Sequence, residues 1–215
     1  AILAVNNGIK EKKRQMKKQF DSLFTNEMMG ESEVYPIISL DENPTEVNLN
    51  PGDELPILPL RNMVIFPGVL VPVSVARPKS LRLIRQVQAN DGLIGACTQI
   101  DKKVEDPTLD QLYKTGVAAQ IVRVLEMPDS TTTVILEGKK RFRLGELVHN
   151  KPYMKAKVYP VDDMLPDSSD KSFIALSSSI RDLAVKIIES SGIIPPEMAF
   201  AIRNIENPVF LINYI

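Results

Sequence analysis

The stretch LPILPLRNMVIFPGVLVPVSVA, residues 55–76, is the most apolar part of the sequence and decides the fold. Four prolines interrupt it: Pro56, Pro59, Pro67 and Pro72. Proline lacks a backbone N–H and has a fixed φ, so it is excluded from helix interiors and from central positions of a sheet. We therefore expect two short strands, at about 55–60 and 68–75, with a turn at 61–62 and a break at 66–68. Prolines at edges and corners are typical of a small bent or closed β-structure.

The residues that follow continue the β pattern. A helix is expected over 78–90, because Pro78 suits a first helical position and apolar residues recur on one face. Five β segments and a short helix that begins near Thr108 are also expected. The β segments are 93–100, the hairpin 117–126 with 132–137, the alternating run 139–148, and 153–161. Residues 53–163 therefore predict a small, mainly antiparallel β-barrel lobe.

Beyond a linker at 165–170 the pattern becomes helical. Residues 171–190 carry an apolar stripe at helical spacing: Phe173, Leu176, Ile180, Leu183 and Ile187. Two further helices are expected to start near Pro195 and Asn207. The last ends on uncapped apolar residues, so we expect a helical lobe at 168–215 that is truncated at its C-terminus. The predicted fold class is α+β, a barrel lobe followed by a helical lobe.

The first 52 residues differ in composition and form a long N-terminal extension. A basic run, KEKKRQMKK at 10–18, precedes an acidic region at 21–54 that has no Lys or Arg. Apolar residues recur at roughly helical spacing over 9–29, which predicts an amphipathic helix. A disordered extension is the equal alternative, because an isolated helix of this length is marginal in water.

Composition limits the class of protein. The net charge is −1, so bulk electrostatics favour neither nucleic acid nor an anionic membrane as a partner. The single cysteine, Cys97, excludes an internal disulfide, and no signal peptide or membrane-spanning run is visible. We therefore expect a cytoplasmic protein with no membrane partner.

The motifs of common enzymes are absent from the sequence. It contains no phosphate loop, no G-x-S-x-G elbow, and one histidine, His149. Cys97 lies within an apolar run and is expected to be a small core residue. We therefore expect that this fragment is not an enzyme and holds no cofactor or metal.

Two basic groups are candidate contacts for acidic partners. The run KKRFR at 139–143 interleaves Phe142 with cations, which allows a stand-alone RNA-binding module, although a solvated strand face is favoured. The second group surrounds the start of the first helix and contains Arg77, Lys79, Arg82 and Arg85.

Several segments in collinear order are similar to one known family. The stretch ELPILPLRNMVIFPGVLVPVSVARPKSLRLI, residues 54–84, resembles the opening of the amino-terminal domain of Lon ATP-dependent proteases. Similar matches follow at 106–116, at 127–141 and, in the helical region, at 194–208. Together they cover about residues 53–215.

This resemblance implies a PUA-like barrel followed by a helical lobe. It implies a parent that is an ATP-dependent serine endopeptidase, whose ATPase module, with ATP and magnesium, and Ser–Lys peptidase lie outside this chain. Family members are cytosolic homohexamers that degrade misfolded and short-lived regulatory proteins. The portion in hand is implied to recognise unfolded or regulatory protein substrates and to support self-association.

A recogniser of unfolded protein needs exposed apolar surface. Candidate contacts near the proline break are Met63, Val64, Ile65 and Phe66, with Arg77, Lys79 and Arg82 nearby. Burial in the core is the alternative for each of these apolar residues taken singly. RNA binding through 139–143 is the second hypothesis, which a steep fall of affinity with salt would distinguish.

Overall fold

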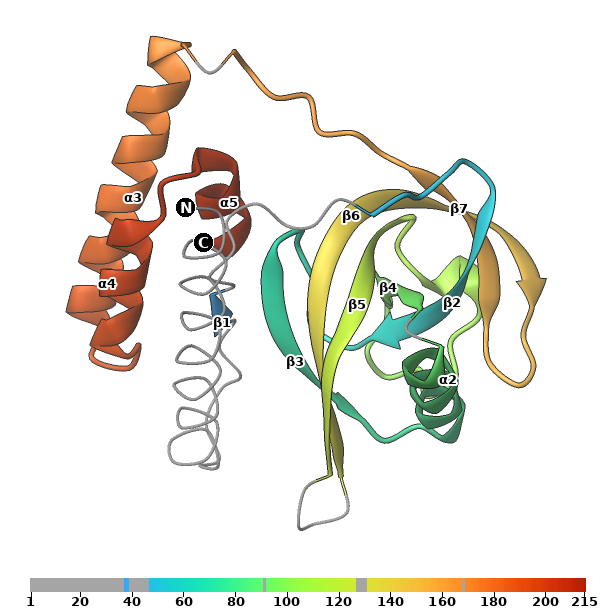
Figure 1. Cartoon of the computed structure of the whole chain (residues 1–215). Helices are drawn as coiled ribbons and strands as arrows, with labels where there is room; N and C mark the ends of the chain where they lie inside the picture. The colour runs from blue at the N-terminus through green and yellow to red at the C-terminus, as the bar shows by residue number, and fades with distance from the viewer. Residues whose placement is uncertain (1–36, 39–46, 91, 127–130, 168) are drawn as a thin grey trace, which may run out of the picture. The chain divides into compact units, whose positions relative to one another are not determined.

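The computed structural model describes residues 37–38, 47–90, 92–126, 131–167 and 169–215 (Figure 1). Residues Pro36–Ile215 form one compact unit. The amphipathic helix predicted over 9–29 lies outside the described residues.

From β2 onwards the described strands and helices follow the order expected from the sequence. The strands are β1 Ile37–Ile38, β2 Asp53–Leu60, β3 Val69–Val75, β4 Leu93–Thr98, β5 Thr115–Glu126, β6 Thr132–His149 and β7 Lys155–Pro160. The helices are α2 Pro78–Ala89, α3 Lys171–Ser191, α4 Pro196–Asn204 and α5 Pro208–Tyr214. The short helix expected near Thr108 is a single 3₁₀ turn, Leu109–Gln111, and the Thr108 backbone N–H donates to Gln111 Oε1 at 3.0 Å.

The strands form one mixed sheet that curls into a small barrel. The paired order is β1-β3-β6-β5-β4-β2-β7, and β7 also pairs with β6, so five strands return on themselves. Register shifts interrupt the β6–β7 ladder, which leaves the closure irregular. The β2–β4 pair is parallel and the other pairs are antiparallel, as expected for a mainly antiparallel lobe.

Strand β2 shows how the prolines are accommodated. Residues 53–56 pair with β7, whereas residues 57–60 pair with β4, so the strand changes neighbour at its middle. Each half therefore has an edge that is not laddered, and Pro56 and Pro59 lie one in each half. The expectation that the prolines occupy edges and corners is confirmed.

Strand β6 is longer than expected. The sequence predicts two segments on either side of Gly138, but β6 runs through as 18 residues. Its first part lies between β3 and β5, and its second part lies between β5 and β7. A Cβ atom at Gly138 would lie 2.1 Å from the carbonyl oxygen of Phe66, so this glycine permits the 61–67 segment to cross the strand.

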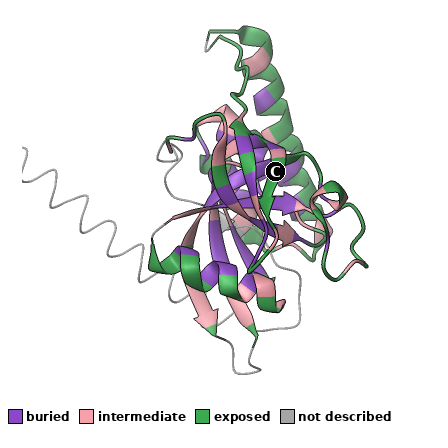
Figure 2. Cartoon of the chain, turned by 90° about the vertical axis from the view of Figure 1, so that its right-hand side faces the viewer, coloured by how far each residue is buried: buried purple, intermediate pink, exposed green. Residues whose placement is uncertain are grey.

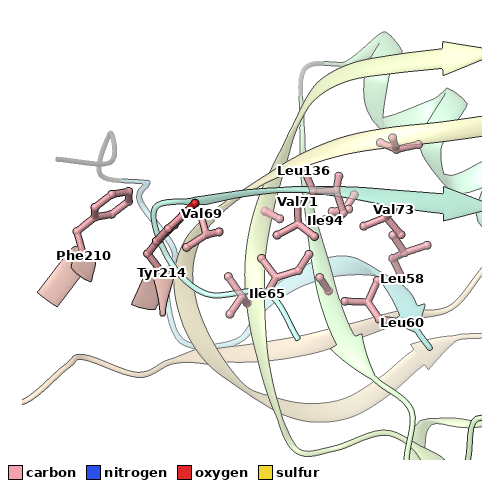
Figure 3. Packing of buried hydrophobic residues seen from close by; sticks show 14 of the residues in the cluster. Leu58, Leu60, Ile65, Val69, Val71, Val73, Ile94, Leu136, Phe210 and Tyr214 are labelled. Atoms are coloured by element: carbon pink, nitrogen blue, oxygen red, sulfur yellow. The ribbon is translucent and has the colours of Figure 1, made fainter. Parts of the chain in front are cut away.

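The barrel interior is filled by apolar side chains from every strand of the ring. Phe142 is fully buried in one cluster, and a second, larger cluster joins the barrel to the helices. Phe210 and Tyr214 of α5 belong to the same cluster as Val69 (Figure 3). Leu211 is also a member of this cluster.

Helix α3 begins and ends as its sequence predicts, but it buries a different face. Asp170 accepts hydrogen bonds from the backbone N–H groups of Ser172 and Phe173, and Gly192 ends the helix with φ 61°. The buried positions are Ser177, Ala184, Val185 and Ile188. The larger apolar stripe faces away from the described part of the chain.

Candidate functional site

The bend between β2 and β3, residues 61–67, places its apolar side chains on alternate sides. Val64 is 59 % exposed and Phe66 is 42 % exposed, whereas Ile65 is 2 % exposed and points into the core (Figure 3). Met63 is half-buried against the core. Of the four apolar residues predicted to contact substrate, Val64 and Phe66 therefore present surface, and Ile65 does not.

Hydrogen bonds hold this bend in place. Thr98 Oγ1 donates to the carbonyl oxygen of Met63 at 2.6 Å, and the N–H of Gly68 donates to the carbonyl oxygen of Gly138 at 2.8 Å. Asn62 has φ 51°, a left-handed conformation that asparagine tolerates better than most residues. The exposure of Val64 and Phe66 is therefore fixed by the backbone.

A small hollow of about 80 Å³ lies beneath the bend and is lined in part by Val64, Phe66, Thr115 and Arg141. The guanidinium carbon of Arg141 lies 5.9 Å from the centroid of the Phe66 ring, within range of a cation–π contact. Phe66 is thus supported on one side and open on the other.

Arg141 also connects the bend to the helical lobe. Its guanidinium donates to Asp163 Oδ2 at 2.5 Å and to Asn213 Oδ1 at 2.6 Å. The Asn213 amide donates in turn to the carbonyl oxygen of Pro67 at 3.1 Å. This network ties α5 to the segment that exposes Phe66.

Most of the cations in the basic run 139–143 are already paired. Lys139 Nζ lies 2.7 Å from Glu137 Oε1, and Lys140 Nζ lies 2.6 Å from Asp162 Oδ1. With Arg141 bound to Asp163, only Arg143 is an exposed cation of this run without a partner in the described chain. Glu137 lies on β6 itself, whereas the pairing of Lys140 and Arg141 depends on β6 lying beside the segment that follows β7.

The second basic group is divided by the fold. Arg77 is half-buried, donates to Gln99 Oε1 at 2.6 Å, and has a lowered pKa because burial disfavours its charge. Lys79 Nζ lies 2.5 Å from Asp106 Oδ2. Arg82 and Arg85 are exposed and have no partner among the residues that the structure describes.

An exposed apolar surface outside the bend was missed as a functional candidate. It lies on the helical lobe, where α3 is mostly exposed (Figure 2). Its exposed large apolar residues, with those of α4 and the connection before it, are Ile174, Leu176, Ile180, Leu183, Ile187, Ile193 and Phe200. The stripe was visible in the sequence, but periodicity alone does not say whether the partner face is present.

Cys97 and His149, the two side chains considered for catalysis, lie in surroundings typical of structural residues. Cys97 is fully buried, and burial raises the pKa of its thiol to about 12, which keeps it protonated. His149 is exposed, with Nδ1 3.3 Å from the carbonyl oxygen of Tyr153. Within the described ranges no three His, Cys, Asp or Glu side chains gather as metal ligands, and no helix is long and apolar enough to span a bilayer.

Comparison with known proteins identifies a family. Residues 54–215 match the family model described as the ATP-dependent protease La (LON) substrate-binding domain. The chain is 44 % identical over 195 residues to a Lon protease of Flavobacterium johnsoniae, covering 91 % of this chain and 24 % of that protein. It is 48 % identical over 184 residues to a Lon protease of Parabacteroides distasonis, covering 84 % of this chain and 22 % of that protein.

The fold has solved counterparts as well. The N-terminal domain of the Mycobacterium avium complex Lon protease aligns with a TM-score of 0.61 at 18 % identity, covering 75 % of this chain and 80 % of that one. At this identity the likeness concerns the fold alone. The chain spans about a quarter of the length of the curated relatives it matches.

Proposed function

Because this chain belongs to the Lon protease family, as its substrate-binding domain, we propose that it binds unfolded segments of protein substrates through exposed apolar surface. The observation that carries the proposal is the rigid bend that holds Val64 and Phe66 outward while Ile65 anchors it in the core. An unfolded chain also exposes apolar side chains. Contact between the two apolar surfaces removes both from water, which favours binding.

The cations around α2 supply a second part of the proposed contact. Arg82 and Arg85 are exposed, and Lys79 lies at the surface beside its partner Asp106. We propose that these side chains favour substrate segments with acidic residues next to apolar ones. Arg77 contributes by holding neighbouring backbone, since its guanidinium donates to the carbonyl oxygens of Pro59 at 3.5 Å and Val104 at 3.4 Å.

The role of the whole protein extends the proposal. We propose a cytoplasmic parent that uses ATP and magnesium, outside the matched residues, to degrade misfolded and short-lived regulatory proteins. Self-association would be supported by this domain, with the exposed face of α3 as the candidate surface. We propose that the parent is a hexamer, as the family resemblance implies.

Site-specific crosslinking tests the contact. A photo-crosslinking amino acid in place of Val64 is expected to capture a denatured model protein, whereas the same group in place of Val122 is not. Val122 is the matched control, because it is an exposed valine on β5 outside the bend. Equal capture at both positions, or capture at neither, would contradict the proposal.

Salt dependence separates this function from RNA binding. Capture through apolar surface is expected to persist as salt rises, because counterion release dominates only the binding of nucleic acid. In the described part of the chain the RNA-binding alternative is not favoured, since the ion pairs of Lys139, Lys140 and Arg141 occupy three of the four cations in the run 139–143.

A further inference from the structure

The outer face of the barrel presents exposed cations on two neighbouring strands, β6 and β7. On β6, Phe142 is fully buried inside the barrel, so its neighbour Arg143 points outward and is exposed. On β7, Val158 is fully buried, so Lys157 and Tyr159 point outward in the same way. Arg143 and Tyr159 are paired across the two strands. Arg143, Lys157 and Tyr159 therefore share one surface, called here the basic face.

The ring of Tyr159 is held in a fixed position on this face. A Cβ atom at Gly145 would lie 2.5 Å from its Cε2 atom, so the ring rests directly on the backbone of β6. Its hydroxyl donates to Glu146 Oε2 at 3.1 Å. Tyr159 is nevertheless 37 % exposed. A ring that is already positioned loses little conformational entropy when a partner covers it.

The carboxylates that border the basic face are already engaged. Glu54 is the cross-strand neighbour of Lys157, but its Oε2 lies 2.8 Å from Lys155 Nζ. The hydrogen bond and the charge of Lys155 lower the pKa of Glu54. Glu146 is engaged by the tyrosine hydroxyl. Arg143 and Lys157 form no ion pair within the part of the chain that the structure describes, so their charges remain available to a partner.

The basic face adjoins the bend between β2 and β3. Thr115 is paired with Arg143 and lines the hollow beneath Phe66. Arg141 lies two residues before Arg143 on the same side of β6, and its guanidinium carbon lies 5.9 Å from the centroid of the Phe66 ring. A partner held on the basic face would therefore lie next to the exposed apolar side chains of the bend.

We propose that the basic face, Arg143, Lys157 and Tyr159, is the docking site for a partner protein that presents an acidic segment. The proposal goes beyond the capture of unfolded substrate, because the recognised feature is charge and not exposed apolar surface. Tyrosine and arginine are enriched among the residues that carry the binding energy of interfaces, and complementary charge selects the partner. An acidic polypeptide fits better than nucleic acid, because Glu54 and Glu146 border the face and repel a continuous phosphate backbone.

Binding of an acidic peptide to the 215-residue chain tests the assignment. The probe is a short fluorescent peptide of alternating Glu and Ser, compared with the same peptide carrying Gln in place of Glu. The Glu peptide is expected to bind about tenfold more tightly at low salt, and the difference should shrink as salt rises, because salt screens exposed charges.

Two double variants locate the binding site. Arg143→Gln with Lys157→Gln is expected to weaken the Glu peptide about tenfold, because both unpaired cations of the face are lost. Both side chains are exposed, so this variant should keep the stability of the wild-type chain. Lys171→Gln with Lys186→Gln is the matched control, because it removes the same charge from exposed positions of α3 and should leave binding nearly unchanged.

Other sites and other occupants give different results. Arg82→Gln with Arg85→Gln should leave the Glu peptide bound, because the probe has no apolar residue; loss of binding in this variant alone would overturn the assignment. Equal affinity for the Glu and Gln peptides, or undiminished binding to the basic-face variant, would also overturn it. If the basic-face variant no longer self-associates in sedimentation, the occupant is a second copy. If a single-stranded oligonucleotide binds the face more tightly than the Glu peptide, the occupant is nucleic acid. Either result would replace the acidic partner.

The docking site and the proposed function can fail separately. The basic-face variant should still capture a denatured model protein through a photo-crosslinking group in place of Val64, since the bend is unchanged. Loss of Glu-peptide binding with capture retained supports two distinct sites. Loss of both together would show that the basic face is part of the substrate contact and would overturn the separate docking site.

Discussion

Gly138 is the residue that allows the bend to rest on the barrel. The carbonyl oxygen of Phe66 comes so close that a Cβ atom at this position would lie 2.1 Å away. The contact is with backbone, which cannot rotate aside as a flexible side chain can. The geometry of the exposed apolar surface therefore depends on a buried residue that lies outside that surface.

Gly138→Ala is expected to lower the free energy of unfolding by about 2 kcal/mol or more, because either the bend or β6 has to move. Chemical denaturation measures this change. Gly92→Ala is the control, since a Cβ there would meet only Val87 at an ordinary 3.7 Å. If the two variants are equally stable, the close approach of the bend is not a constraint.

Cys97 predicts a dependence of stability on pH. Burial raises the pKa of its thiol from the ordinary value of 9.0 to about 12 in the folded state. The protonated thiol is therefore compatible with folding below pH 9, and stability is lost as pH rises from about 9 towards 12. Thiol labelling at pH 8 is expected to be slow in the folded protein and fast in urea. Cys97→Ala should flatten the alkaline part of the stability profile, whereas rapid labelling without denaturant would show that the thiol is accessible.

At the scale of elements, strand β6 carries both the predictable and the unpredictable parts of the fold. Its alternation and the hairpin with β5 were predicted from the sequence, because each depends on neighbouring residues. Its continuity through Gly138 was not, since the glycine reads as a break until the segment crossing it is known. The ion pairs of Lys140 and Arg141 were also missed, because their acidic partners lie on the segment that follows another strand.

The bend between β2 and β3 likewise has features that the sequence predicts and features that it does not. The prolines and the turn at 61–62 were enough to predict two strands and a corner. They could not tell which of Met63 to Phe66 faces outward, because a single register step exchanges the two sides. The structure assigns Val64 and Phe66 to the surface.

Arg141→Ala is expected to destabilise the protein by about 1–2 kcal/mol, because Asp163 and Asn213 lose a charged partner and Phe66 loses its cation–π contact. Thermal unfolding gives the size of the effect, and protease cleavage in the linker near 163–170 should become faster. Arg143→Ala is the control on the same strand, where the side chain is exposed and has no partner in the described chain. Similar losses of stability for both variants would show that Arg141 does not connect the bend to the helical lobe.

At the scale of the whole molecule, the helical lobe exposes more large apolar residues than the barrel bend does. Leu176, Leu183 and Ile187 of α3 are each about 60 % exposed. A surface of this kind is typical of interaction sites on otherwise soluble folds. This exposed face of α3 is on a different side of the helix from the packed face that includes Ile188.

The double substitution Leu176→Ser with Leu183→Ser is expected to reduce self-association, measured by sedimentation over a range of concentrations. Its effect on the free energy of unfolding should stay within about 0.5 kcal/mol, because neither side chain is buried. Ile188→Ser on the packed face should instead cost about 2–4 kcal/mol. An unchanged association for the double variant would exclude this face as the contact.

The pairing of β2 with β7 also determines when the barrel can close while the chain is being synthesised. Asp53 pairs with Val158, about a hundred residues later, and the Asn213 amide reaches back to Pro67. Contacts so distant in sequence form late, because the intervening chain has first to be made and then closed into a loop. A nascent chain that ends at residue 150 should therefore remain protease-sensitive, while one that ends at 170 should gain resistance. Until β7 emerges from the ribosome, each new copy is itself an unfolded polypeptide with an apolar proline-rich stretch, the kind of client that finished copies are proposed to hold.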